Sequence, residues 1–116
     1  MIDKVTIAVR DMAGMVAFYG AVLGVSFEER ELAGHALQAA TAGGVEFLLC
    51  PAELAGVAAD VNTVQLRLLV EDVAAAYGAG LMAGGESLAE PELREGRPSA
   101  ALRDLDGNSL ELTEPR

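Results

Sequence analysis

Two glutamates in separate apolar stretches are the residues of this chain best placed to do chemistry. Glu46 lies within residues 45–50, and Glu111 lies within residues 109–113. Two carboxylates that share a cleft can hold a divalent cation, or one of them can keep a raised pKa and move a proton beside a carbonyl group. A cation between the carboxylates would neutralise them instead, and Lys4 and Arg67 stand in two further apolar stretches. The chemistry therefore depends on which strands bring these side chains together.

Strand periodicity predicts that these residues share one side of a sheet. Apolar residues alternate with others in residues 3–10, 45–50, 64–70 and 109–113, which is typical of half-buried strands. The side chains expected to point at covering helices are Val5, Ile7, Val9, Val45, Phe47, Leu49, Val64, Leu66, Leu68, Leu110 and Leu112. The opposite, uncovered face then carries Lys4, Thr6, Glu46, Leu48, Cys50, Gln65, Arg67, Leu69, Ser109, Glu111 and Thr113.

Two helices are expected, one after the first strand of each half. Asp11 is a good N-cap ahead of apolar residues at helical spacing, and Gly24 closes that helix. Asp72 caps a second helix that runs to about Gly84. Its buried stripe is expected to contain Val73, Ala76, Tyr77, Gly80 and Leu81.

The two halves of the chain repeat one pattern. Asp72 follows Asp11 at an offset of 61 positions, and Glu111 follows Glu46 at an offset of 65. Short strands at 25–32 and 35–41 have weaker counterparts around 86–93 and 97–103. A duplicated βαβββ unit accounts for these repeats. We therefore predict a single α+β domain over residues 1–116, with modules at about 1–51 and 62–116 and a connector at 52–61.

The two modules are expected to pair into a curved mixed sheet with a concave cleft. In that arrangement the position of Lys4 corresponds to that of Gln65, and Glu46 faces Glu111 across the cleft. The sequence leaves open whether the modules pair within one chain or across a dimer. Residues 84–98 are expected to form a mobile rim of the cleft or a solvated loop.

Composition narrows the classes of function. Eight basic residues against 18 acidic ones give a net charge of −10, and the basic residues do not cluster, which argues against binding to nucleic acid or to an anionic membrane. No stretch reaches the roughly 18 apolar residues of a membrane span and no leader pattern is visible, so we expect a cytoplasmic protein. The single cysteine, Cys50, and the single histidine, His35, exclude a disulfide within the chain and a zinc site of the usual kind.

Several motifs of the chain resemble the vicinal oxygen chelate superfamily, which contains glyoxalase I, bleomycin-resistance proteins, fosfomycin-resistance thiol transferases and extradiol dioxygenases. Besides the repeat, the resemblance rests on Val9-Arg10-Asp11, Ala17-Phe18-Tyr19, Leu23-Gly24, Asp104-Leu105-Asp106-Gly107-Asn108 and Leu110-Glu111-Leu112. The resemblance covers essentially the whole chain and implies the glyoxalase/bleomycin-resistance fold. Because one fold hosts many chemistries, it does not by itself imply a reaction.

Catalytic members of this superfamily hold a divalent metal at four strand positions, which the resemblance places at Lys4, Glu46, Gln65 and Glu111. The two first-strand positions are usually histidine, and a protonated Lys4 has no lone pair for a metal. The resemblance is therefore nearest to the metal-free bleomycin-resistance type. We expect ion pairs Lys4–Glu46 and Arg67–Glu111 in place of the metal. The alternatives are that both cations extend into solvent, or that one divalent metal binds at Glu46, Gln65 and Glu111.

The function that this resemblance implies is non-catalytic binding of a small molecule, such as a drug in antibiotic resistance, without a cofactor. Phe27 is the one aromatic side chain expected in the groove. The expected ligand-binding residues are Lys4, Thr6, Phe27, Glu46, Leu48, Gln65, Arg67 and Glu111. Small members of the superfamily close the cleft by dimerising, so a homodimer is expected. The alternatives are a metal-dependent or acid/base lyase, isomerase or dioxygenase, and a structural member without a ligand.

Overall fold

A computed structural model describes residues 2–52 and 65–115 of the chain, which form an α+β structure of two modules. The predicted connector lies outside the described residues except for Ala52, and Val64 also lies outside them. Within the described residues, no helix is long and apolar enough to cross a membrane.

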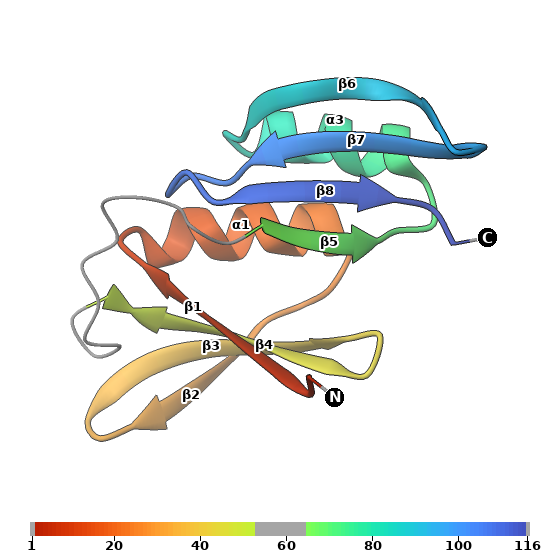
Figure 1. Cartoon of the computed structure of the whole chain (residues 1–116). Helices are drawn as coiled ribbons and strands as arrows, with labels where there is room; N and C mark the ends of the chain where they lie inside the picture. Colours follow the sequence, from red (N-terminus) through yellow and green to blue (C-terminus); the bar gives the residue numbers. More distant parts are fainter. Residues whose placement is uncertain (1, 53–64, 116) are drawn as a thin grey trace.

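The first module has the order βαβββ that the repeat predicts (Figure 1). It contains β1 (Lys4–Val9), α1 (Met12–Leu23), β2 (Glu28–Leu32), β3 (His35–Ala42) and β4 (Val45–Pro51). The strands form a mixed sheet, sheet A, in the order β1-β4-β3-β2, with β1 parallel to β4 and the other neighbours antiparallel.

The second module repeats this topology. It contains β5 (Gln65–Leu69), α3 (Val73–Met82), β6 (Glu86–Arg94), β7 (Arg97–Arg103) and β8 (Ser109–Thr113). These strands form sheet B in the order β5-β8-β7-β6, with β5 parallel to β8. The predicted duplication of a βαβββ unit is thereby confirmed. Among the described residues, no ladder joins sheet A to sheet B.

Each helix begins at the aspartate that the sequence predicts. The carboxylate of Asp11 accepts a hydrogen bond from the backbone N–H of Gly14 at 3.0 Å, and that of Asp72 accepts one from Ala75 at 3.0 Å. These bonds satisfy donors of the first turn that lack partners within the helix. Gly24 ends α1 with a φ of 66°, a left-handed conformation that glycine adopts without a steric penalty.

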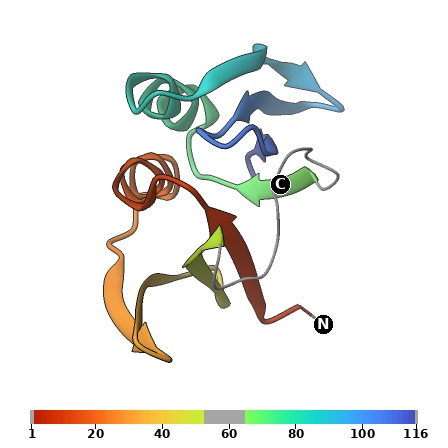
Figure 2. The same cartoon turned by 90° about the vertical axis from the view of Figure 1, so that its left-hand side faces the viewer.

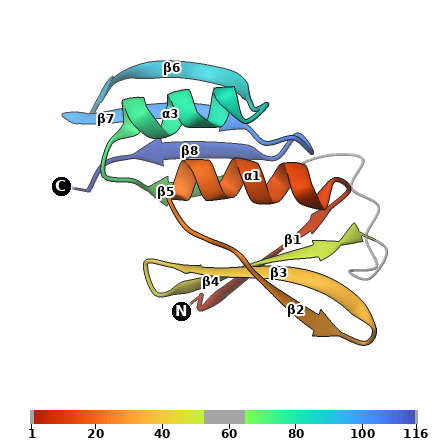
Figure 3. The same cartoon turned by 180° about the vertical axis from the view of Figure 1, so that it is seen from behind.

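One core joins the two modules. The helices α1 and α3 pack against each other, and the views in Figure 2 and Figure 3 show them side by side. The predicted helix-facing residues Leu49, Leu110 and Leu112 are completely buried. The expectation for Leu81 is wrong, because its side chain is exposed near the end of α3, whereas Val73, Ala76 and Gly80 are buried.

Residues 84–98 are mostly a strand, so the predicted rim or solvated loop is wrong for β6. This strand pairs with β7 along its length, with irregular register between Ser87 and Ala89 and between Ala89 and Glu92. Pro91 lies in this irregular part of an edge strand. Proline is tolerated there because an edge strand has one side on which no N–H is needed for a ladder.

A buried hydrogen bond ties the first module to the second. The Tyr19 hydroxyl on α1 donates to Asp104 Oδ2 at 2.7 Å, and both residues are buried. Asp104 also accepts from the backbone N–H groups of Asp106 and Asn108 and from the Asn108 side chain, at 2.9, 2.9 and 2.7 Å. Burial, and then the neighbouring charge of Asp104, raise the pKa of Tyr19 far above its usual range. The turn between β7 and β8 is thereby held against α1.

Candidate functional site

The polar face of sheet A is the face opposite its helix, and it carries Glu46 between two cations. Lys4 lies directly across the β1–β4 ladder from Glu46, and its Nζ is 3.4 Å from Glu46 Oε1. Arg30 Nη1 donates a hydrogen bond to Glu46 Oε2 at 2.9 Å. The bond from Arg30, followed by the effect of Lys4, holds the pKa of Glu46 below its usual range. Glu46 is therefore a carboxylate at neutral pH, with both oxygens engaged.

Arg30 is a site residue that the sequence reasoning missed. It lies on β2, which β3 separates from the Glu46 strand β4, and its ladder partner is Leu37. Its side chain therefore crosses β3 to reach Glu46. Period-two alternation in β2 could have placed Arg30 on the polar face, but only the order of the strands shows that it reaches Glu46.

The polar face of sheet B carries a second, separate ion pair. Arg67 Nε donates to Glu111 Oε1 at 2.7 Å, across the ladder between β5 and β8. Gln65 lies opposite Ser109 instead, and its Nε2 donates to Ser109 Oγ at 2.6 Å. Both predicted ion pairs, Lys4–Glu46 and Arg67–Glu111, are confirmed.

The register changes the correspondence between the modules. Lys4 is opposite Glu46 in the first module, whereas the basic residue opposite Glu111 in the second module is Arg67. Lys4 and Gln65 occupy corresponding sequence positions in the two modules, but Lys4 lies opposite Glu46, whereas Gln65 lies opposite Ser109.

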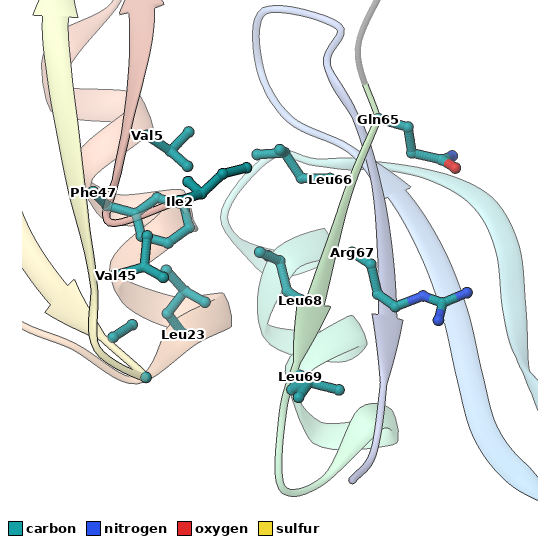
Figure 4. A pocket seen from close by; sticks show the side chains of 12 residues that line it. Ile2, Val5, Leu23, Val45, Phe47, Gln65, Leu66, Arg67, Leu68 and Leu69 are labelled. Carbon is teal, nitrogen blue, oxygen red and sulfur yellow. The ribbon is translucent and has the colours of Figure 1, made fainter.

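Within one chain, the apolar faces of the two sheets face each other. Val5 and Phe47 of sheet A and Leu66 and Leu68 of sheet B line one pocket of about 440 Å³ between the modules. Figure 4 shows Leu66 and Leu68 pointing from β5 toward the first module, while Arg67 points to the other side of the strand. The two polar faces consequently point away from each other, and among residues 2–52 and 65–115 no ion pair or hydrogen bond joins one polar face to the other. The expectation that Glu46 faces Glu111 across a cleft is therefore wrong for the single chain, because the faces that meet between the modules are the apolar ones.

The remaining predicted site residues divide between the polar face and the core. Thr6 and Leu48 are ladder partners beside Lys4 and Glu46, so they lie on the polar face of sheet A. Phe27 precedes β2 and packs, partly buried, against the hydrophobic core, which is not the placement expected for a groove residue. Cys50 is buried as a free thiol.

A smaller pocket of about 220 Å³ lies on the polar face of sheet B. Gln65 and Glu111 line it together with Arg94 of β6, and the short side chains of β7 lie between them. This pocket contains two of the predicted ligand-binding residues and one arginine that the sequence reasoning did not single out.

The described side chains around Glu46 and Glu111 do not fit a resident metal ion. In residues 2–52 and 65–115, no three His, Cys, Asp or Glu side chains form a group that could hold one. Glu46 is paired with two cations, and Glu111 is paired with a third. A metal at either carboxylate would have to displace a guanidinium or ammonium group, and the charge of the neighbouring cation would repel it.

Comparisons with known proteins agree with the fold. The family described as a glyoxalase-like domain matches residues 4–113. No curated protein sequence matches the chain. A glyoxalase-related enzyme from Fulvimarina pelagi superimposes with a TM-score of 0.81 at 17% identity, over 99% of this chain and 88% of that one.

Two further solved structures are similar over nearly their whole length. A glyoxalase/bleomycin resistance protein from Albidiferax ferrireducens T118 gives a TM-score of 0.79 at 22% identity, over 99% of this chain and 98% of that one. TnmS3, an antibiotic binding protein from Streptomyces sp. CB03234, gives a TM-score of 0.72 at 18% identity, over 100% of this chain and 96% of that one. At these identities the likeness establishes the fold.

Proposed function

The chain belongs to the glyoxalase-like domain family, and from that premise we propose that it binds a small organic molecule, such as an antibiotic, on its polar sheet faces without a metal and without turnover. The observation that carries the proposal is the neutralisation of both central carboxylates by cations of the chain itself. Lys4 and Arg30 pair with Glu46, and Arg67 pairs with Glu111. TnmS3, which has the same fold, supports this choice because it is an antibiotic binding protein.

The state of Glu46 argues against acid/base catalysis, which was the principal alternative. A general acid or base works best when its pKa lies near the working pH. Here the pKa of Glu46 is lowered by Arg30 and Lys4, so the carboxyl is neither a proton donor at neutral pH nor a strong base. Two carboxylates that raise each other's pKa would need to be neighbours, whereas Glu46 and Glu111 lie on different sheets and each pairs with cations of its own sheet.

We propose further that the ligand cleft is completed by a second copy of the chain. The polar faces of one chain point apart, so a cleft bounded by both kinds of face requires sheet A of one copy and sheet B of another. The strands β1 and β5 lie at the edges of their sheets, so one side of each strand is not paired with another strand of the described chain. Ile2 and Leu69 beside the 440 Å³ pocket are 71% and 63% exposed. A partner that covered this apolar surface would stabilise the pair.

A ligand screen with product analysis tests the proposed function. The purified protein is screened by thermal shift against glycopeptides, phenazines and quinones, and each compound that raises Tm is recovered and analysed by mass spectrometry. A ligand present at one hundred times its Kd stabilises the folded state by about 2.7 kcal/mol, which corresponds to about 10 °C in a domain of this size. The expected result is such a shift with the compound recovered unchanged.

Two outcomes would contradict the proposal. Chemical conversion of a bound compound would make the protein an enzyme. Stoichiometric Mn²⁺, Ni²⁺ or Zn²⁺ in metal analysis of the purified protein would restore the metal-dependent alternative. Light scattering tests the assembly, and a monomer at micromolar concentration would show that the cleft is not shared between copies.

A further inference from the structure

We infer that the pocket on sheet B recognises a planar ligand of one or two rings that carries an oxyanion at one end and a hydrogen-bond donor at the other. This inference rests on the proposed function and names the class of ligand for one part of the site. It assigns a recognition role to Arg94, which binds the oxyanion, and to Glu111, which accepts from the donor.

The floor of the pocket favours a flat ligand. Ala89 of β6 and Ser99 and Ala101 of β7 all line the pocket. Ala89 lies opposite Ala101, and Ala101 lies opposite Glu111. Leu88 of β6 also lines the pocket and adds an apolar contact beside these short side chains, so a ring can lie flat against this part of the floor. The volume of about 220 Å³ is below the roughly 300–1,000 Å³ of pockets for drug-sized ligands, which limits the ligand to one or two rings.

One wall of the pocket donates hydrogen bonds through Arg94, and the other accepts them through Glu111. Arg94 comes from β6, while Glu111 comes from β8, with β7 between these two strands. The ladder partner of Arg94 is Arg97 and that of Glu111 is Ala101, so the two walls are offset by four residues along β7 as well as separated by that strand. A ligand that spans the floor therefore meets a donor at one end and acceptors at the other.

Both walls keep unused hydrogen-bonding capacity. Arg94 Nε donates to Glu92 Oε1 at 2.9 Å, which leaves its two terminal nitrogens without partners among the described residues, and the side chain is 59% exposed. Glu111 Oε1 accepts from Arg67, while its Oε2 has no partner among residues 2–52 and 65–115. Gln65 donates through Nε2 to Ser109, so its amide oxygen is a second acceptor on the Glu111 side.

The charge of the surrounding face suits an oxyanion although the chain as a whole is acidic. Arg67, Arg94, Arg97 and Arg103 all lie on the polar face of sheet B, as their ladder partners show. The net charge of the chain is −10. The same ladders place Glu86, Glu92 and Glu111 on this face, where the arginines outnumber them and so offset the general repulsion of anions. The hydrogen bond from a guanidinium to an oxyanion is of the strong, charge-assisted kind.

A matched set of naphthalene compounds tests the inference. The probes are 6-hydroxy-2-naphthoate, its methyl ester, 6-methoxy-2-naphthoate and the cation 2-naphthylmethylamine, and their affinities are measured by calorimetry with the full chain. We expect 6-hydroxy-2-naphthoate to bind best. Loss of the oxyanion in the ester, or of the hydroxyl donor in the methoxy compound, is expected to weaken binding about tenfold.

The variant Arg94→Gln identifies the residue that binds the oxyanion. This variant is expected to lower the affinity for 6-hydroxy-2-naphthoate about tenfold and to leave the affinity for its methyl ester nearly unchanged. Arg103→Gln is the matched control, because Arg103 lies on the same face but does not line the pocket. It is expected to change both affinities less than twofold. A second variant, Ala101→Leu, fills the floor of the pocket and is expected to lower the affinity for 6-hydroxy-2-naphthoate. Its thermal unfolding is expected to stay cooperative, which shows that the variant is folded.

The outcomes separate this inference from the proposed function. If the amine binds as tightly as the acid, or if Arg94→Gln and Arg103→Gln act alike, the assignment of ligand class is wrong while small-molecule binding stands. If no naphthalene probe binds but a compound of the wider screen does, the ligand class is again wrong. If nothing in either set binds, both proposals fall.

Discussion

Removal of the Tyr19 hydroxyl is the sharpest test of how the two modules are held together. Tyr19 is completely buried, and its hydroxyl donates to Asp104 Oδ2 at 2.7 Å. Tyr19→Phe keeps the ring in place and deletes this single bond. A hydrogen bond to a charged acceptor contributes about 1.5–3 kcal/mol. Since Asp104 keeps three other donors, we expect a loss of about 2 kcal/mol in the free energy of unfolding.

Thermal and urea unfolding followed by circular dichroism measure this loss. Unfolding entropy for a chain of this length converts about 2 kcal/mol into a fall of about 8 °C in Tm. Tyr77→Phe is the matched control, because the Tyr77 hydroxyl also donates at 2.6 Å, but to the exposed Ser87. Its expected cost is below about 0.5 kcal/mol. Equal losses in the two variants would show that the bond between the modules carries no special stability.

The raised pKa of Tyr19 adds a pH signature to the same variant. In the unfolded chain Tyr19 ionises near its usual value of 10.0, whereas in the folded chain it stays neutral. The stability that this group contributes is therefore fully present below pH 10 and is lost as the pH rises. By pH 11 the wild type should have lost about 1.4 kcal/mol from this group. The gap between wild type and Tyr19→Phe should shrink accordingly, and a gap that stayed constant from pH 8 to pH 11 would refute the assignment.

Two further predictions concern a close backbone contact and the Glu46 carboxyl. A Cβ atom at Gly85 would lie 2.9 Å from the Gly80 carbonyl oxygen and 3.1 Å from the Arg103 carbonyl oxygen. Because backbone cannot move aside easily, Gly85→Ala is expected to lower the free energy of unfolding in urea by about 1–3 kcal/mol, and an unchanged midpoint would show that the contact relaxes freely. Arg30 is the main cause of the lowered pKa of Glu46, so Arg30→Ala should raise the pKa that nuclear magnetic resonance measures for the Glu46 carboxyl. The ion pair is present above the unfolded pKa of Glu46 and is lost as the pH falls through its folded pKa, and an unchanged titration in the variant would remove Arg30 from the site.

Much of the fold could be predicted because its determinants are local. The N-caps at Asp11 and Asp72 and the turn at Gly24 depend on neighbouring residues, and each is present as predicted. Strand alternation likewise predicted that Leu49 and Leu110 would be buried. These features need no knowledge of which strand lies beside which.

The failures arise where the outcome depends on distant partners. Leu81 has the helical spacing of a buried residue, but it lies near the end of α3, and the side chain is left exposed. Residues 84–98 were expected to form a rim or a loop, whereas β6 pairs with β7 as an edge strand, where the missing N–H of Pro91 is tolerated. Phe27 alternates with the polar residues of β2 and packs against the core. In each case, packing beyond the local segment decided the result.

The sequence by itself determined the two βαβββ modules and the residues on each face of their strands. Only the tertiary structure decided that Arg30 reaches Glu46 from two strands away, that Arg67 rather than Gln65 lies opposite Glu111, and that the polar faces of one chain point apart. The physical reason is that alternation depends on each strand alone. Register and the packing of one sheet against another are instead set by contacts between residues far apart in the chain.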